Sequence, residues 1–393
     1  MATRAVHSGE PDTVAGAHPV SAAIHPSASF YYDHAAELDA VAGGAEGYMY
    51  GRYRNPTCVG FERAVAELEG ADGALSFGSG MAALHASILA SGVGPGEVIV
   101  CAQEIYGGTL GLLMNVLAPL GIEIRLADLN RPDSLDQALA GAGVRLVVAE
   151  SLSNPLLRVA DLATLAEKTH AAGAKLLVDA TFTSPVLLQA LKLGADFSVH
   201  SATKYLSGHG DAMGGVVAAA SNELATLDGL RKSVGGILGP FTAWTILRGI
   251  RTLPLRMERQ CANAARVAAF LRAHPAIERV HYPGFDDHPD HATAARQFGG
   301  RFGAMVSFAV RGADRSGILA LMDRLQLCLP CTSLGDVQSL VLYPVLSSHR
   351  DMSPKQRARV GIGDNLLRLS VGIEDAEDII ADLDQALKGA LKG

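Results

Sequence analysis

The chain has 393 residues, of which 49% are hydrophobic and 19% charged, and its formal net charge is −7 at pH 7. This composition is typical of a globular protein, and the length exceeds what one core usually serves, which predicts two domains. The negative charge and the absence of a basic block argue against a nucleic-acid partner. We also expect no membrane partner and a cytoplasmic location, because no apolar run reaches the roughly 18 residues that span a bilayer and charged residues interrupt the first dozen positions.

The five cysteines are an odd, sparse set, which fits a reducing compartment better than a disulfide framework. Cys328 and Cys331 do have the C-x-x-C spacing of redox and metal sites. However, the motif lies by an apolar, strand-like run at 325–329 and not at a helix start that would lower a thiol pKa. Since no second cysteine pair completes a zinc site, the sequence predicts no metal centre.

Residues 1–56 show no clear periodicity and are rich in alanine, glycine, proline and aromatic side chains. This content is too apolar for a disordered tail. We predict an extended N-terminal arm that packs on another part of the assembly, with a neighbouring subunit as one candidate.

Residues 57–252 are predicted to form the first domain, in which short apolar runs alternate with helix-length segments. A typical helical segment is Ala163–Ala172, which follows the N-cap candidate Asp161. The alternation predicts an α/β fold with a mostly parallel sheet covered by helices on both faces. The expected strands are Val98–Cys101, Ile122–Leu126, Arg145–Ala149, Lys175–Asp179, Phe197–His200 and Gly215–Ala219.

Residues 253–393 are predicted to form a smaller C-terminal α/β domain, because short strands replace the longer alternation after about residue 275. Helices at Pro240–Arg251 and Pro254–His274 are expected to bridge the two domains. The expected later elements are strands at Arg279–Tyr282, Ala304–Val310, Gln338–Tyr343 and Leu366–Val371, with helices at Arg315–Leu325 and Asp375–Leu391.

The segment from Ser201 to Asp211 carries the strongest chemical signal, since Lys204 follows two hydroxyl residues and precedes a glycine-rich turn. Upstream, the apolar run 176–178 ends in Asp179. Pyridoxal phosphate (PLP) requires an amine, an anion beside its pyridine nitrogen and donors around its phosphate. Lys204, Asp179, and Ser201 with Thr203 meet these needs. Each residue alone would more often be a solvated lysine or a turn residue, so the prediction depends on the whole set.

Five further positions fit the same cofactor and its amino-acid substrate. Gly80 and Met81 open a predicted helix whose small residues expose backbone N–H groups to a phosphate. Tyr106 can stack on the pyridine ring, and Asn154 can reach its hydroxyl. Arg368 lies in an apolar strand, where an arginine needs an anionic partner such as a substrate carboxylate; a structural ion pair is the alternative.

These motifs occur in an order that resembles the Cys/Met-metabolism PLP enzymes, the cystathionine γ-synthases, cystathionine γ-lyases, methionine γ-lyases and their relatives. The resemblance extends from Ala5-Val-His-Ser-Gly-Glu10 to Arg368-Leu-Ser-Val-Gly-Ile-Glu374, nearly the whole chain. It implies the type I PLP-dependent transferase (aspartate aminotransferase-like) fold. It also implies a homotetramer of two tight dimers, in which two subunits share each active site.

The resemblance also implies residue roles. Lys204 would bind the cofactor covalently and act with Tyr106 and Asp179 in catalysis, while Tyr50 and Arg52 would reach the phosphate in the neighbouring subunit. The cofactor-binding residues would be Tyr50, Arg52, Gly80, Met81, Tyr106, Asn154, Asp179, Ser201, Thr203 and Lys204. The substrate-binding residues would be Tyr50, Asn154, Thr332, Ser333 and Arg368.

The expected chemistry is carbon–sulfur bond cleavage by γ-elimination. Lys204, with its pKa lowered by burial and a nearby cation, would remove the Cα proton of the substrate. Tyr106 would protonate the leaving thiolate. The products would be a 2-oxo acid, ammonia and a thiol.

Substrate choice follows from departures from the family pattern. Cystathionine-processing members usually have a glutamate at the position of Thr332, and many γ-synthases have an acid at the position of Met49. Without these anions a distal ammonium group would lose its partner, which favours a substrate with an uncharged end, such as methionine or homocysteine. The typical methionine γ-lyase, however, has a cysteine where this chain has Gly108, so neither pattern is complete.

Three alternatives stay open. The first is γ-replacement on an activated homoserine, which would give cystathionine or another thioether. The second is a β-lyase that acts on cystine or cystathionine. The third is a non-catalytic scaffold or regulatory protein, against which the combined presence of Lys204, Asp179, Tyr106 and Arg368 argues.

Overall fold

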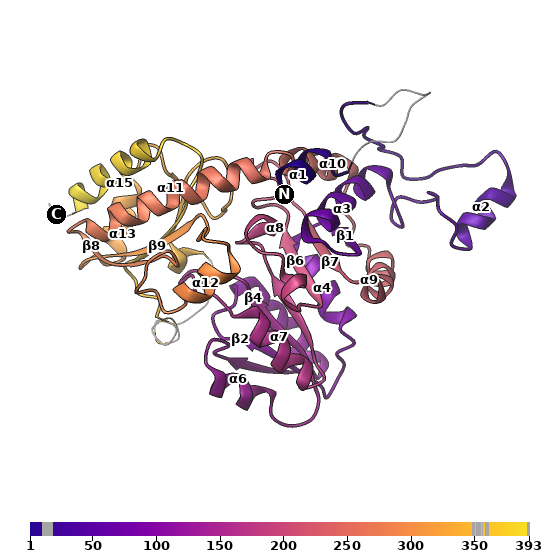
Figure 1. Cartoon of the computed structure of the whole chain (residues 1–393), viewed down its shortest axis with the longest axis horizontal. Helices are drawn as coiled ribbons and strands as arrows, with labels where there is room; N and C mark the ends of the chain where they lie inside the picture. The colour runs from indigo at the N-terminus through magenta and orange to yellow at the C-terminus, as the bar shows by residue number, and fades with distance from the viewer. Residues whose placement is uncertain (10–18, 348–349, 351–354, 356, 358–360, 391–393) are drawn as a thin grey trace.

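The computed structural model describes residues 1–9, 19–347, 350, 355, 357 and 361–390. Two sheets organise this part of the chain, one of seven strands and one of five. The long helix α11 (Leu253–Ala273) runs from one sheet to the other (Figure 1). The α/β prediction is confirmed.

The large sheet has the strand order β1-β7-β6-β5-β4-β2-β3. Neighbouring strands are parallel except at β7, which is antiparallel to both β1 and β6. The predicted strands of this sheet are confirmed to within one residue at each end, but β1 was not predicted. The strands are β1 (Gly73–Phe77), β2 (Val98–Ala102), β3 (Glu123–Ala127), β4 (Val144–Glu150), β5 (Lys175–Asp179), β6 (Phe197–Ser201) and β7 (Gly215–Ala219).

Helices cover both faces of the large sheet, which explains why its strands are apolar at consecutive positions. In β4, Val147 and Ala149 pack in the core that contains α3 and α7, whereas Leu146 and Val148 pack in the core that contains α4. The helices around this sheet are α3 (Pro56–Glu69), α4 (Gly80–Ala90), α5 (Gly107–Leu112), α6 (Pro132–Leu139), α7 (Leu162–Ala171), α8 (Ser184–Leu187), α9 (Ser221–Val234) and α10 (Pro240–Ile250), with short helical turns at Leu113–Leu117, Ala118–Leu120 and Ala190–Leu193.

The small sheet has the order β10-β11-β12-β9-β8, with only the β10–β11 pair parallel. Its strands are β8 (Ile277–His281), β9 (Met305–Val310), β10 (Leu329–Pro330), β11 (Leu340–Leu342) and β12 (Leu366–Ser370). The elements around it are α12 (His291–Gln297), α13 (Arg315–Met322), a short turn at Pro344–Leu346 and α15 (Ala376–Ala390). The predicted end of the last helix, Leu391, lies outside the described residues.

The two faces of β12 have different environments because strand side chains alternate. Leu367 and Leu369 join the core formed with α11, α13 and α15. Arg368, which lies between these two leucines, therefore points to the opposite face, toward the large sheet, where it hydrogen-bonds Asn154.

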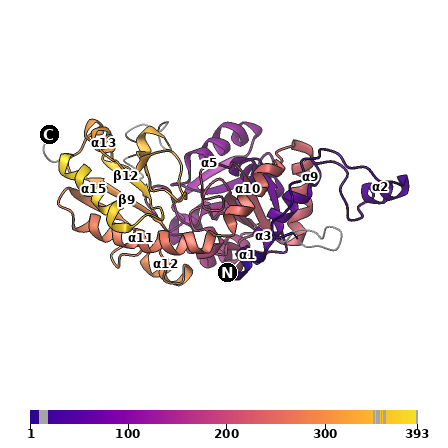
Figure 2. The same cartoon turned by 90° about the horizontal axis from the view of Figure 1, so that it is seen from above.

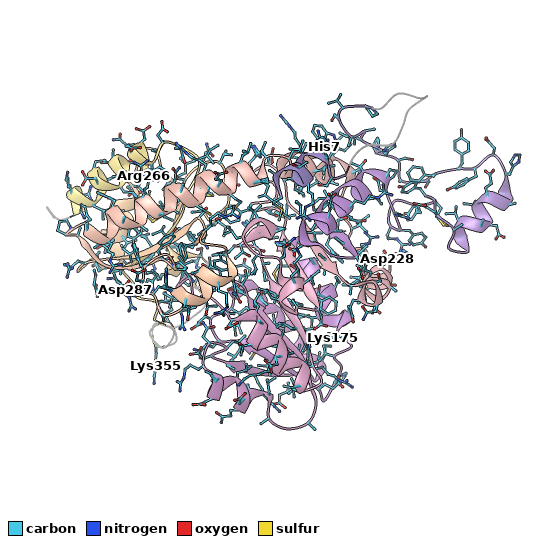
Figure 3. The ribbon with its side chains drawn as sticks, in the orientation of Figure 1. His7, Lys175, Asp228, Arg266, Asp287 and Lys355 are labelled. Atoms are coloured by element: carbon cyan, nitrogen blue, oxygen red, sulfur yellow. The ribbon has the colours of Figure 1, made fainter. Side chains whose placement is uncertain are left out.

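The two long helices that cover this core are also joined at its outer surface, where Arg266 of α11 forms an ion pair with Glu377 of α15 (Figure 3).

Helix α11 bridges the two cores, as its sequence predicted. Its first half contributes Leu253 and Met257 to the core of the large sheet, and its second half contributes Val267 and Leu271 to the core of the small sheet. The boundary at 252/253 remains a prediction, since both sides of it share one helix bundle around α10 and α11.

The N-terminal region combines a packed start with a projecting excursion. Helix α1 (Ala2–His7) packs against α3 and α11, while α2 (Ala35–Ala42) lies far from the two sheets (Figures 1 and 2). A bridge between Ser29 and Tyr50 joins the two sides of this excursion. No helix in the described part of the chain is long and apolar enough to cross a lipid bilayer.

Candidate active site

A cavity of about 540 Å³ lies where the carboxyl ends of the parallel strands of the large sheet face β11 and β12. This is the expected ligand position for an open parallel sheet. The residues that line it are Ser79, Gly80, Met81, Leu84, Tyr106, Glu150, Leu152, Asn154, Asp179, Thr181, Phe182, Ser201, Thr203, Lys204, Met213, Thr332, Leu334, Leu342, Ser347 and Arg368.

Asp179 ends β5 and enters the cavity as a carboxylate without an ion-pair partner among the described residues. Its side chain accepts a hydrogen bond from the backbone N–H of Thr181 at 2.9 Å. Burial raises the pKa of Asp179, and hydrogen bonding to Thr181 opposes the rise. Such a carboxylate favours a protonated nitrogen as its partner.

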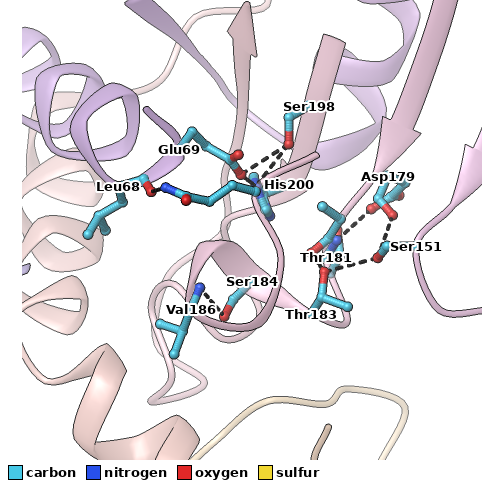
Figure 4. A network of polar contacts seen from close by, with 12 residues as sticks. Leu68, Glu69, Ser151, Asp179, Thr181, Thr183, Ser184, Val186, Ser198 and His200 are labelled. Atoms are coloured by element: carbon cyan, nitrogen blue, oxygen red, sulfur yellow. Dashed lines mark hydrogen bonds and ion pairs between the residues drawn. The ribbon is translucent and has the colours of Figure 1, made fainter. Parts of the chain in front are cut away.

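A polar network supports the segment that carries Asp179 (Figure 4). Ser151 hydrogen-bonds the hydroxyl of Thr183 at 3.0 Å and the backbone carbonyl of Asp179 at 3.3 Å. Nearby, Glu69 and His200 form an ion pair in which neither side chain is more than 1% exposed. These contacts hold the ends of β4, β5 and β6 in a fixed arrangement.

The start of α4 and the loop after β6 form a narrow cradle of small residues. A Cβ atom on Gly80 would lie 2.9 Å from Cβ of Ser201, and one on Gly215 would lie 2.2 Å from the carbonyl oxygen of Ser79. The hydroxyl of Thr203 is fixed by the backbone of Gly214 at 3.0 and 3.3 Å. Because only small residues fit, backbone N–H groups at this helix start stay accessible to a phosphate.

Lys204 reaches the cavity with one hydrogen bond, from Nζ to Oγ of Ser333 at 3.1 Å. Burial lowers the pKa of Lys204, and the Arg368 guanidinium lowers it further. A lysine in this state loses its proton more readily than a surface lysine, which suits both covalent attachment to an aldehyde and proton transfer.

Arg368 is 2% exposed, and its hydrogen-bond acceptors among the described residues are neutral. Its Nη1 donates to Oδ1 of Asn154 at 2.9 Å and its Nη2 donates to the carbonyl of Ser333 at 3.1 Å. Burial lowers the pKa of Arg368 to about 10. The structural ion pair considered for this arginine is therefore absent among the described residues, and the guanidinium is available to an incoming carboxylate.

Tyr106 lines the cavity and its ring folds back over the next turn of chain. A Cβ atom on Gly108 would lie 2.4 Å from Cε1 of Tyr106. A cysteine at position 108 would consequently require the ring to move. The difference from the methionine γ-lyase pattern is therefore coupled to the orientation of Tyr106.

Tyr50, Arg52 and Ser333 are the predicted site residues that do not line the cavity, although Ser333 lies close enough to accept a hydrogen bond from Lys204. Arg52 packs over the ring of Tyr53 at 4.8 Å and donates to the backbone carbonyl of Lys232. It lines a separate hollow of about 770 Å³ together with Met49. Tyr50 is 42% exposed. The role of Tyr50 and Arg52 in a neighbouring subunit stays a prediction.

The cysteine motif does not form a second site. Cys328 is 1% exposed and belongs to the core of the small sheet, whereas Cys331 is exposed, and both thiols are free. The described residues contain no group of three or more metal-ligating side chains.

Sequence reasoning assigned no role to several residues that the structure brings to the site. Thr181 accepts from the backbone N–H of Ser201 at 2.8 Å and so connects β5 to the lysine loop. Glu150 lies beside Asp179 in the parallel register of β4 and β5. Asp336 is 6% exposed and contributes a negative charge near Lys204. Of Thr181, Glu150 and Asp336, only Glu150 could have been noticed from the sequence, because it directly follows a predicted strand.

The residues around the cavity fit pyridoxal phosphate: a buried lysine with a lowered pKa, an unpaired carboxylate and a cradle that only small residues allow. With a mixed seven-stranded sheet and a second smaller sheet, this arrangement defines a type I PLP-dependent enzyme.

Comparisons with known proteins identify the family. A family model described as "Cys/Met metabolism PLP-dependent enzyme" matches residues 2–388. Cystathionine gamma-lyase of Bacillus subtilis is 41% identical over 88% of this chain and 90% of its own, and L-methionine gamma-lyase of Fusobacterium nucleatum is 38% identical over 99% and 98%. A crystal structure of cystathionine gamma synthase from Xanthomonas oryzae, in complex with aminoacrylate and cysteine, is 39% identical with a TM-score of 0.93, covering 100% of this chain and 98% of that chain.

This chain belongs to the Cys/Met metabolism PLP-dependent enzyme family, and its cofactor is pyridoxal 5′-phosphate. The predictions of fold class, cofactor and enzyme family are confirmed, and a non-catalytic scaffold is not supported. An amino-acid substrate fits this family. Since relatives with three different names have nearly the same identity, the reaction has to be argued from the cavity.

Proposed function

We propose that this protein is a carbon–sulfur lyase that performs γ-elimination on a sulfur amino acid with an uncharged end, such as methionine or homocysteine. The products are a 2-oxo acid, ammonia and a thiol. The proposal extends the family assignment to a reaction and a substrate class.

The distribution of charge in the cavity carries the proposal. Among the described lining residues, the carboxylates and cations are Glu150, Asp179, Lys204 and Arg368. The position next to Ser333 that would carry a glutamate for a distal amine is Thr332. Because a buried ammonium group without an anion is unfavourable, this wall favours a neutral substrate end.

The residues then divide the work. Arg368, with Ser333 beside it, binds the substrate carboxylate through its free hydrogen-bonding capacity. Lys204 Nζ removes the proton from Cα, a proton then leaves Cβ, and the hydroxyl of Tyr106 donates a proton to the sulfur that departs from Cγ. One water is consumed when the 2-oxo acid and ammonia are released. When bound, PLP supplies the electron sink that makes the Cα proton acidic. Asp179 holds the pyridine nitrogen protonated.

Further parts of the proposal concern the cofactor and assembly. Gly80, Met81, Ser201 and Thr203 bind the phosphate, and Asn154 contacts the ring hydroxyl, with Tyr106 stacked on the ring. Tyr50 and Arg52 act in the neighbouring subunit of a cytoplasmic homotetramer. Tyr50 also takes part in substrate binding. The projecting excursion with α2, which has no buried residue, supports a role in assembly.

The test is a product assay on the purified holoenzyme with methionine, homocysteine, cystathionine, cystine and O-acetylhomoserine, the last with and without cysteine. We expect 2-oxobutyrate from methionine or homocysteine at a higher kcat/KM than from cystathionine. Pyruvate as the main product would indicate β-elimination, and a thioether would indicate γ-replacement; either result contradicts the proposed reaction.

A matched pair of variants tests the role assigned to Thr332. Thr332→Glu introduces an anion at the wall and should raise kcat/KM for cystathionine by about tenfold, a typical value for one added charged contact. Thr332→Val, which has nearly the same shape, should not. Equal effects of the two variants would show that charge at this position does not select the substrate.

A further inference from the structure

Glu150 is a cavity residue to which the proposed reaction assigns no task. It ends β4, directly beside Asp179 of β5 in the sheet register. Its Oε1 accepts the backbone N–H of Tyr106 at 2.9 Å, and its Oε2 accepts the backbone N–H of Asn154 at 3.3 Å. One carboxylate therefore ties together the two loops that carry the ring-stacking tyrosine and the residue that hydrogen-bonds Arg368.

This arrangement is electrostatically unfavourable for the fold alone. Burial raises the pKa of Glu150 well above its usual range, and the neighbouring Asp179 raises it further. The described residues give it no salt bridge, in contrast to the fully buried Glu69, which pairs with His200. A carboxylate kept beside another without a cation partner indicates a use in the site and not in stability.

Two features of the structure set the position of Tyr106, one at its backbone and one at its ring. Glu150 fixes its backbone N–H, and the absence of a side chain at Gly108 leaves the space in which its ring lies. Tyr106 as a whole is 40% exposed in this chain. Asn154 is likewise fixed at its N–H by Glu150 and at Oδ1 by Arg368.

We propose that Glu150 is a positioning residue, whose carboxyl group sets Tyr106 and the Asn154–Arg368 pair in their working geometry through the two hydrogen bonds that it accepts. The proposal rests on the proposed function for the task of Tyr106 as the proton donor. It does not rest on which sulfur amino acid the enzyme uses.

The decisive variant is Glu150→Gln, which keeps the size of the side chain but can accept from only one of the two N–H groups. We expect kcat to fall by about 100-fold, the usual consequence of a small displacement of a catalytic group. KM should stay within about threefold, because Arg368 still binds the carboxylate. Glu150→Asp, which keeps the charge, should recover part of kcat.

Two readouts separate positioning from a general structural role. The visible circular dichroism of the bound cofactor reports the placement of Tyr106 and should change in Glu150→Gln and in Gly108→Ala alike. The pH profile of kcat should lose its Glu150-dependent acidic limb in Glu150→Gln. The other ionisable groups that face this carboxyl group are Cys101, Glu104, Tyr106, Asp179 and Arg368.

Glu104→Gln is the matched control, since Glu104 is a half-buried carboxylate close to Glu150 whose side chain hydrogen-bonds Gln103 and has no described bond to Tyr106 or Asn154. It should leave kcat within about twofold of the wild type. The proposal is overturned if Glu150→Gln leaves kcat, dichroism and pH profile unchanged, or if its only effect is a lowered melting temperature. Dichroism does not depend on turnover, so a wild type that performs replacement or β-elimination would contradict the proposed function and still test Glu150.

Discussion

Two buried arginines in this molecule differ in what surrounds them. Arg231 of α9 is 7% exposed and forms ion pairs with Glu62 and Asp228, each at 2.6 Å. Arg368 is 2% exposed, and its described partners are an amide oxygen and a backbone carbonyl. Each leaves Nε without a hydrogen bond. They differ in that Arg231 has carboxylate partners, whereas Arg368 has none among the described residues.

The electrostatic consequence is opposite in the two places. Burial lowers the pKa of Arg231, but Glu62 and Asp228 outweigh burial and the pKa ends above its usual value. At Arg368 burial dominates and lowers the pKa to about 10. The fold thus neutralises the buried cation of Arg231 with carboxylates and gives Arg368 none among the described residues, which is the arrangement that binding of an anionic ligand at Arg368 would need.

The largest expected effect on stability is at the neutralised arginine. Arg231→Met removes the cation and leaves Glu62 buried with only Ser76 as a partner, at 2.9 and 2.7 Å. Breaking such a pair typically lowers the free energy of unfolding by about 3–5 kcal/mol. Urea unfolding of the apoprotein measures this.

The double variant Arg231→Met with Glu62→Gln checks the cause. It removes the stranded charge, so it should be more stable than Arg231→Met alone. If the double variant is no better, the loss comes from packing and the electrostatic interpretation of this region is wrong.

A smaller effect, and one on catalysis instead of stability, is expected at the unpaired arginine. Arg368→Ala should raise KM and lower kcat/KM by the equivalent of about 2–4 kcal/mol, because a substrate carboxylate loses its charged partner. The free energy of unfolding should not fall as it does for Arg231→Met. Steady-state kinetics and urea unfolding on the same preparation test both halves; an unchanged KM would place the carboxylate elsewhere.

The sequence predicted the large sheet and the central residues of the site because both depend on local patterns. Apolar runs that end in Asp179 or precede Lys204 identify strand ends, and strand ends converge in a parallel sheet. Strand β1 was missed, since Gly73 and Ala74 weaken its β-propensity and its pairing with β7 comes from distant residues.

Contacts between segments far apart in the chain could not be predicted in this way. No local pattern shows that Glu150 bonds the backbone of Tyr106, 44 positions away, or that Arg368 lacks a carboxylate. Of the two hydrogen-bond partners of Arg368, Asn154 follows a strand of the large sheet and Ser333 lies between β10 and β11, so both are distant from Arg368 in the sequence. Tyr50 and Arg52 lie outside the cavity of their own chain, and their role in a neighbouring subunit stays a prediction.

The smallest effect we predict concerns the second unpaired cation of the cavity, Lys204. Its pKa in the folded apoprotein is lowered by burial and by Arg368, relative to the ordinary value of 10.5 that the unfolded chain has. Between the lowered pKa and 10.5 the unfolded chain binds more protons than the folded one, so stability rises with pH across this window. Below the window the full penalty of the charged lysine is present.

Lys204→Met removes that penalty. The variant apoprotein should therefore be more stable than the wild-type apoprotein near pH 7, with a difference that shrinks as the pH approaches 10. Lys175→Met is the control, because Lys175 pairs with Glu223 at 2.7 Å and its removal should not stabilise the fold. Urea midpoints of the variant and wild-type apoproteins between pH 7 and 10 test this prediction. A pH-independent difference in midpoint, or a less stable Lys204→Met, would mean that burial in the cavity does not disfavour the charged form of Lys204.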